Sequence, residues 1–113
     1  MSATITGDRL IEVGVILHHD VNGDHTGRAH VRGVFSERGV EQVAPIRDSA
    51  EAAAADIDTI NEHGLSWWLC SYSSRSARVI AATGEHASDI AYQRRGQHPF
   101  EVLRLSTISE GQS

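Results

Sequence analysis

Histidine and acidic side chains gather in one short stretch of the sequence, His18-His19-Asp20-Val21-Asn22-Gly23-Asp24-His25. Within it, Asn22-Gly23 favours a two-residue type I′ hairpin turn, because both residues tolerate the positive φ that this turn requires. Such a turn sets Asp20 opposite His25 and Ile16 opposite Ala29. Since side chains alternate between the two faces of a strand, His18, Asp20 and His25 are then predicted to share one face at the hairpin tip.

Two imidazoles and one carboxylate suit zinc or another divalent transition metal, and the same three groups could pass protons to one another. A fourth ligand has to come from a distant part of the chain, and the candidates are His63, His86, His98 and Cys70. The alternative interpretation is that polar side chains simply decorate an exposed loop. A calcium loop is excluded, because His25 stands where that loop needs glycine and Val31 where it needs a bidentate glutamate.

A second group with chemical potential is the pair Arg94-Arg95, which precedes Gly96. Two arginines at this place are typical of a solvated helix end, where they complement the helix dipole. They could equally contact an anionic small molecule, since guanidinium groups recognise carboxylates and phosphates well. Cys70 has no basic neighbour in sequence and is expected to fill space as a small apolar side chain.

These residues must be positioned by strands and helices, and the sequence pattern predicts both. Runs rich in β-branched, aromatic or alternating apolar residues indicate strands, whereas capping residues and apolar spacing of three to four indicate helices. The expected strands cover residues 9–19, 28–36, 65–72, 77–82 and 100–108, with a short further strand over 41–46. A helix is expected over Ala50–His63, with a capping-box pattern in Asp48 and Glu51 and a C-cap at Gly64, and a second helix is favoured over strand for Thr83–Arg95.

This order, ββ(β)αββ(α)β, predicts an α+β fold with a mainly antiparallel sheet of about five strands and one or two helices packed on one face. A length of 113 residues suits a single domain over 1–113, with residues 1–8 and 109–113 expected to be flexible tails. Two hairpin-plus-helix units follow each other, but they share no residue pattern that can be aligned.

Composition excludes several classes of function. The net charge is −5, and the 10 basic residues, all arginine, are interleaved with acids, which argues against nucleic acid as a partner. No segment has the length of apolar residues that a bilayer span needs, and the N-terminus lacks the features of a secretory signal. A single cysteine permits no internal disulfide. We therefore expect a soluble, cytoplasmic protein, and the absence of lysine suggests a GC-rich genome such as that of an actinobacterium or one of its phages.

Trp67 and Trp68 are adjacent on an expected strand and therefore point to opposite faces of the sheet. Val13 and Val15 raise the same issue in the first strand, which carries apolar residues on both faces. Either both faces are covered within the chain, or one face contacts a partner. The leading hypothesis is a non-enzymatic binding or assembly module that forms a homo-oligomer or docks a protein partner through Trp67 or Trp68 with Val13 and Val15. The alternatives are a metal-dependent or His-based small enzyme using His18, Asp20 and His25, and a small-ligand binding protein using Arg94 and Arg95.

Overall fold

The computed structural model describes residues 9–108 and contains two antiparallel sheets of three strands each, with two helices. The expected flexible tails lie outside the described residues. The predicted α+β class is confirmed, but the prediction of one sheet is replaced by two sheets, with strand orders β1-β2-β3 and β5-β4-β6. The elements are β1 (Leu10–His19), β2 (His25–Phe35), β3 (Gly39–Gln42), α1 (Ala50–His63), β4 (Leu65–Ser71), β5 (Ser76–Ala81), α2 (Gly84–Arg95) and β6 (Glu101–Ile108).

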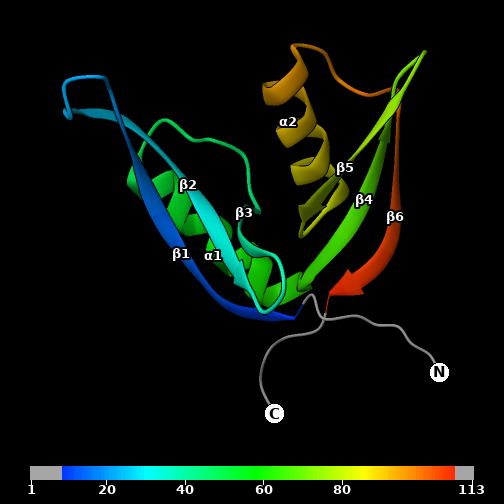
Figure 1. Cartoon of the computed structure of the whole chain (residues 1–113), viewed down its shortest axis with the longest axis horizontal. Helices are drawn as coiled ribbons and strands as arrows, with labels where there is room; N and C mark the ends of the chain where they lie inside the picture. Colours follow the sequence, from blue (N-terminus) through cyan, green and yellow to red (C-terminus); the bar gives the residue numbers. More distant parts are fainter. Residues whose placement is uncertain (1–8, 109–113) are drawn as a thin grey trace.

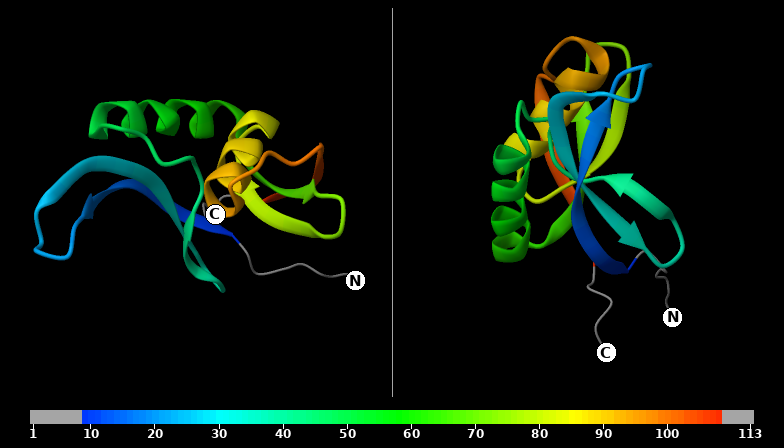
Figure 2. Two further views of the ribbon diagram at one scale, coloured as in Figure 1. Left: turned by 90° about the horizontal axis from the view of Figure 1, so that it is seen from above. Right: turned by 90° about the vertical axis from the view of Figure 1, so that its left-hand side faces the viewer.

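Within residues 9–108 the sheets are separate, because no strand of the first half pairs with a strand of the second. Figure 1 shows two arms that meet at the base of a V, one built from the first sheet with α1 behind it and the other from the second sheet with α2 on its inner side. The views in Figure 2 show that α1 lies across the first sheet and that α2 stands between the arms. Each helix therefore covers one face of its own sheet, where the sequence suggested a shared face.

Both predicted helices are present, and local chemistry sets their ends. Ser49 caps α1, since its side chain accepts a hydrogen bond from the Ala52 amide at 3.1 Å, so the N-cap lies one residue after the predicted Asp48. Thr83 caps α2 in the same way through the amide of His86. Gly96 ends α2 with a φ of 83°, a left-handed conformation in which a side chain would be strained.

The two arms share a hydrophobic core at the base of the V. Ile60 of α1 and Val31 of β2 come from the first half, and Leu65, Ile80 and Ile108 come from the second. All are nearly inaccessible to solvent. Since burial of each large aliphatic side chain contributes about 1.5–3 kcal/mol, this shared core stabilises the packing of the two halves against each other. A second core lies between α2 and the second sheet and includes Cys70, Val79 and Ile90, which confirms the expected role of the cysteine as a buried apolar side chain.

The third strand differs from its expected position. It was predicted over residues 41–46, whereas β3 ends at Gln42 and the chain continues as a loop beside β2. In that loop the Val43 amide donates to Val31, and a single bridge pairs Arg47 with Ala29. The two halves are also no repeat, because β2 is the central strand of the first sheet and the central strand of the second is β4, the first strand of its half.

Candidate functional site

The tip of the β1–β2 hairpin has a wider turn than the sequence predicted. His19 pairs with His25, which leaves the five residues 20–24 as the loop, and Ile16 pairs with His30 where Ala29 was expected. A bulge accounts for the shift: Thr26, Gly27 and Arg28 lie opposite His18 alone. Gly27 has a φ of 89°, which allows the extra residues to fit. The predicted two-residue turn and its register are therefore wrong.

Asp20 explains why the wider loop is preferred. Its carboxylate accepts hydrogen bonds from the amides of Asn22 at 2.8 Å and Asp24 at 3.0 Å, and its own amide donates to the Asp24 carbonyl. Because this side chain satisfies two loop amides, it stabilises the five-residue loop over the two-residue turn that Asn22-Gly23 favours. Both hydrogen bonds are accepted by Oδ1 of the carboxylate that the metal hypothesis assigned as a ligand.

The histidines of the tip form two separate pairs. His18 Nε2 lies 2.7 Å from His30 Nδ1, and the two rings meet edge to face. His19 instead contacts His25, with ring centroids 4.4 Å apart. The face shared by His18, Asp20 and His25 is therefore not formed, because the bulge moves His25 beside His19. Over residues 9–108 no group of three His, Cys, Asp or Glu side chains is placed to hold a metal ion.

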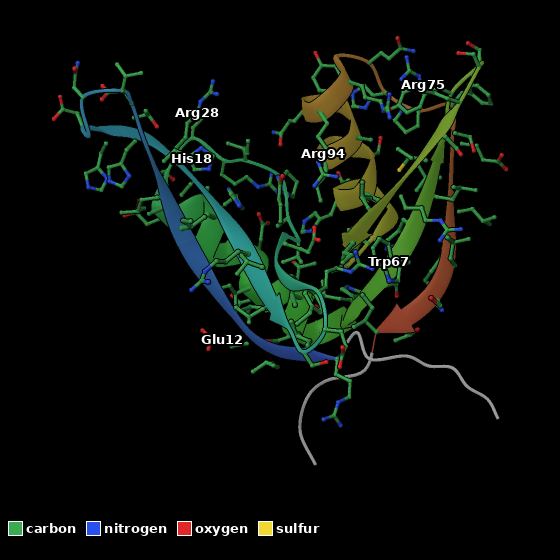
Figure 3. All side chains as sticks on the ribbon, viewed as in Figure 1. Glu12, His18, Arg28, Trp67, Arg75 and Arg94 are labelled. Carbon is green, nitrogen blue, oxygen red and sulfur yellow. The ribbon has the colours of Figure 1, made fainter. Side chains whose placement is uncertain are left out.

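The His18–His30 pair faces the space between the arms. Figure 3 shows His18 and Arg28 on the hairpin and Arg94 on the facing side of α2. The pKa of His30 is lowered, first by its burial and then by the nearby positive charges of His18 and Arg94. Because a 2.7 Å contact between ring nitrogens needs one donor and one acceptor, a neutral His30 suits the geometry.

Both tryptophans have partners within the chain. Trp68 lies on the face toward α2, where its Nε1 donates to the Ala81 carbonyl at 3.0 Å and its ring packs against Gly84. Trp67 lies on the other face, at the base of the V (Figure 3), with the Arg38 guanidinium 4.7 Å from its ring centroid. Each indole is half-buried. Each indole therefore has contacts within the chain and keeps part of its surface exposed, and the docking of a partner through Trp67 or Trp68 stays a prediction.

Among the described residues, strand β1 carries three exposed large aliphatic side chains, one more than β6. It forms one edge of its sheet, since β2 is its one pairing partner between residues 9 and 108. Val13 and Val15 are half-buried against the core, whereas Ile11, Ile16 and Leu17 are 58%, 42% and 40% exposed. The strand has ten residues, and the amide and carbonyl groups along its outer edge point away from the sheet. Such an edge is a template for pairing with another strand.

A buried charged cluster between the helices was not predicted from the sequence. Asp56 of α1 is 5% exposed and accepts hydrogen bonds from Arg47 at 2.8 and 3.0 Å. The same carboxylate lies 3.5 Å from Nε2 of His86 at the start of α2, while Nδ1 of that ring is buried with no hydrogen-bond partner among residues 9–108. Burial lowers the pKa of His86, while Asp56 acts in the opposite direction. Asp56 and His86 are nearly enclosed, the Arg47 side chain is 32% exposed, and together they link α1 to the start of α2.

Arg94 and Arg95 point to different places. Arg94 is close enough to His30 to lower its pKa, whereas the guanidinium carbon of Arg95 lies 5.3 Å from the centre of the Tyr72 ring. Gln93 ties α2 to the loop before α1, since its side-chain amide exchanges two hydrogen bonds with the backbone of Ile46, at 2.7 and 3.0 Å. Arg94 and Arg95 therefore do not form the single basic loop that was expected at this helix end.

No family model, no curated protein and no solved structure matches this chain. Among residues 9–108, neither helix has the length and hydrophobicity to span a bilayer.

Proposed function

We propose that this chain is a non-enzymatic assembly module that pairs with a second copy of itself, strand β1 against strand β1 in antiparallel orientation. The observation that carries the proposal is the edge of β1 that no other strand of residues 9–108 covers, with its large exposed aliphatic side chains. Pairing would extend each three-stranded sheet into a continuous sheet of two copies and would satisfy the outward-pointing amides and carbonyls of both strands.

Geometry restricts the possible registers. In an antiparallel pair, two directly opposite residues are either both hydrogen-bonded to each other or both not. The twofold axis between two identical strands must therefore pass midway between one residue and the same residue of the second copy. An axis through a given residue denotes the axis at this midpoint. An axis through Val15 sets Val13 opposite Leu17 of the second copy, on the face that carries α1. It also aligns nine residues, from Ile11 to His19, which is close to the full length of the strand.

Charge selects this register among those that geometry allows. With the axis through Val15, Glu12 lies opposite His18 of the second copy, and symmetry gives two such pairs. An axis through Gly14 sets Glu12 opposite Ile16, and an axis through Ile16 sets it opposite Asp20. Glu12 is the one acidic residue of β1 and is exposed. A pair of opposite or hydrogen-bonding side chains across strands contributes about 0.2–1 kcal/mol, and like charges there are destabilising.

Sedimentation equilibrium over a wide concentration range tests the proposal. We expect a mass that rises from the 12.3 kDa of one chain to about twice that value. Glu12→Arg should weaken the dimer about tenfold, because two pairs are lost for each dimer, and the double variant Glu12→Arg/His18→Glu should restore it with the charges exchanged. Glu62→Arg, a change of equal charge on the exposed side of α1, is the matched control.

Two results would overturn the proposal. One is a strict monomer up to about 0.2 mM, a concentration at which even micromolar dimers are saturated. The other is a dimer that Glu12→Arg and Glu62→Arg affect equally, because the register then has no support.

A metal-dependent function is the second candidate: the rings of His18 and His30 already meet, and a metal ion would replace the 2.7 Å contact between their nitrogens. In the proposed dimer, Glu12 of the second copy would lie opposite His18, so that two imidazoles and one carboxylate would come together only after assembly. Metal analysis of purified wild-type and His18→Ala protein tests this candidate. Stoichiometric zinc that is lost in the variant would support it, and no bound metal in a confirmed dimer would remove it.

A further inference from the structure

The turn between β4 and β5 and the end of α2 together form a small hollow of about 160 Å³. Figure 3 shows Arg75 at this outer end of the second arm, far from the hairpin tip of the first. Polar groups line the hollow. Its walls are Tyr72, Ser73, Ser74, Arg75, Arg95 and Gln97.

The framework of this hollow is held in place. The Tyr72 amide donates to the Arg75 carbonyl at 2.7 Å, which closes the turn and leaves Ser73 and Ser74 at its tip. Tyr72 is 9% exposed, and its hydroxyl donates to the Gln97 carbonyl at 3.2 Å, so the turn is fixed to the chain after α2. Arg95 stacks over the same ring, which restricts its guanidinium to the wall of the hollow.

The two arginines bring positive charge that the described chain leaves uncompensated. Neither Arg75 nor Arg95 has a carboxylate within ion-pair distance between residues 9 and 108, in contrast to Arg47 with Asp56. Glu101 is close along the sheet, but it pairs with Ser71 and therefore projects from the face opposite to that of Tyr72. The partial negative charge at the end of α2, about half an elementary charge, is smaller than the two full charges of the arginines.

We propose that this hollow binds a small phosphate-bearing anion between Arg75 and Arg95. Guanidinium groups match the oxygens of phosphate with paired hydrogen bonds, and serine hydroxyls and turn amides add donors of the correct kind. A dianion neutralises both arginines, whereas a carboxylate leaves one positive charge. The volume is well below the roughly 300–1,000 Å³ of sites for drug-sized ligands, so the site accommodates a phosphate group and not a whole nucleotide.

Titration of ¹⁵N-labelled full-length protein with orthophosphate at pH 7.5 and fixed ionic strength tests the site. We expect saturable shifts of the Ser73, Ser74 and Gln97 amides. Arg75→Ala and Arg95→Ala should each weaken apparent binding about tenfold. Arg78→Ala is the matched control, because Arg78 lies on β5 opposite Leu69, on the other face of the sheet, and should bind within about twofold of wild type.

Glycerol 3-phosphate and acetate complete the experiment. Binding of orthophosphate alone identifies the free ion as ligand, and equal or tighter binding of glycerol 3-phosphate identifies a phosphate monoester; both support the proposal. Acetate that binds as tightly as phosphate would overturn it, as would shifts that do not saturate or a loss in Arg78→Ala as large as in the two site variants. The site does not involve β1, so its failure leaves the proposed assembly unaffected.

Discussion

The strongest structural prediction concerns Asp56, which joins the loop before α1, α1 itself and α2. We consider Asp56→Asn, which keeps the shape of the side chain and removes its charge. Two charge-assisted hydrogen bonds to Arg47 lose strength, at 2.8 and 3.0 Å in the wild type, and so does the 3.5 Å contact with His86. Removing one partner of a fully buried ion pair costs about 3–5 kcal/mol.

Water reduces that cost at one end of the pair, since the Arg47 side chain is 32% exposed, and asparagine still offers one acceptor. We therefore expect the free energy of unfolding to fall by about 2–3 kcal/mol. For 113 residues this lowers Tm by about 8–13 °C. Urea denaturation followed by circular dichroism measures the change through the midpoint, provided that the slope is unchanged.

Asp58→Asn is the matched control, because it makes the same substitution at an exposed position of the same helix. We expect it to change the free energy of unfolding by no more than about 0.5 kcal/mol. If the two variants have the same midpoint, the Arg47–Asp56–His86 cluster does not stabilise the packing of the helices, and the reasoning is refuted.

Three further predictions follow from burial and packing. Burial lowers the pKa of His86, so the unfolded chain takes up a proton near pH 6.5 while the folded protein does not. The free energy of unfolding should therefore fall as pH decreases below about 7, with a slope of up to about 1.4 kcal/mol per pH unit for this group. His86→Gln should flatten the profile of urea midpoint against pH, and His63→Gln, the control, should not. Gly33→Ala should destabilise by about 1–3 kcal/mol, because its Cβ would lie 3.1–3.2 Å from three core side chains, whereas Gly14→Ala meets nothing within 4 Å; a similar Tm for both would contradict the packing argument. Ile60→Ala should cost about 3 kcal/mol in urea denaturation, since Ile60 is 2% exposed in the core shared by both arms, and a loss below about 1 kcal/mol would show that this core does not join them.

Local sequence patterns determined the elements of this protein. The runs of alternating apolar residues, the capping side chains before residues 50 and 84, and the glycines at 64 and 96 act over a few residues, so the helices and most strands follow from neighbouring positions. The α+β class follows from the order of these elements.

The tertiary structure decided everything that depends on residues distant in sequence. The division into two sheets depends on which strands pair, and pairing joins residues that are distant in sequence. The register of the first hairpin was set by the Asp20 carboxylate and by positive φ at Gly27, where the Asn22-Gly23 pattern pointed to a tighter turn. Likewise, Arg47, Asp56 and His86 form a cluster, and Arg75 and Arg95 share a hollow, only because the helices pack where they do. A contact between side chains tens of residues apart leaves no periodic signal along the chain, so no pattern in the sequence could have indicated these two sites.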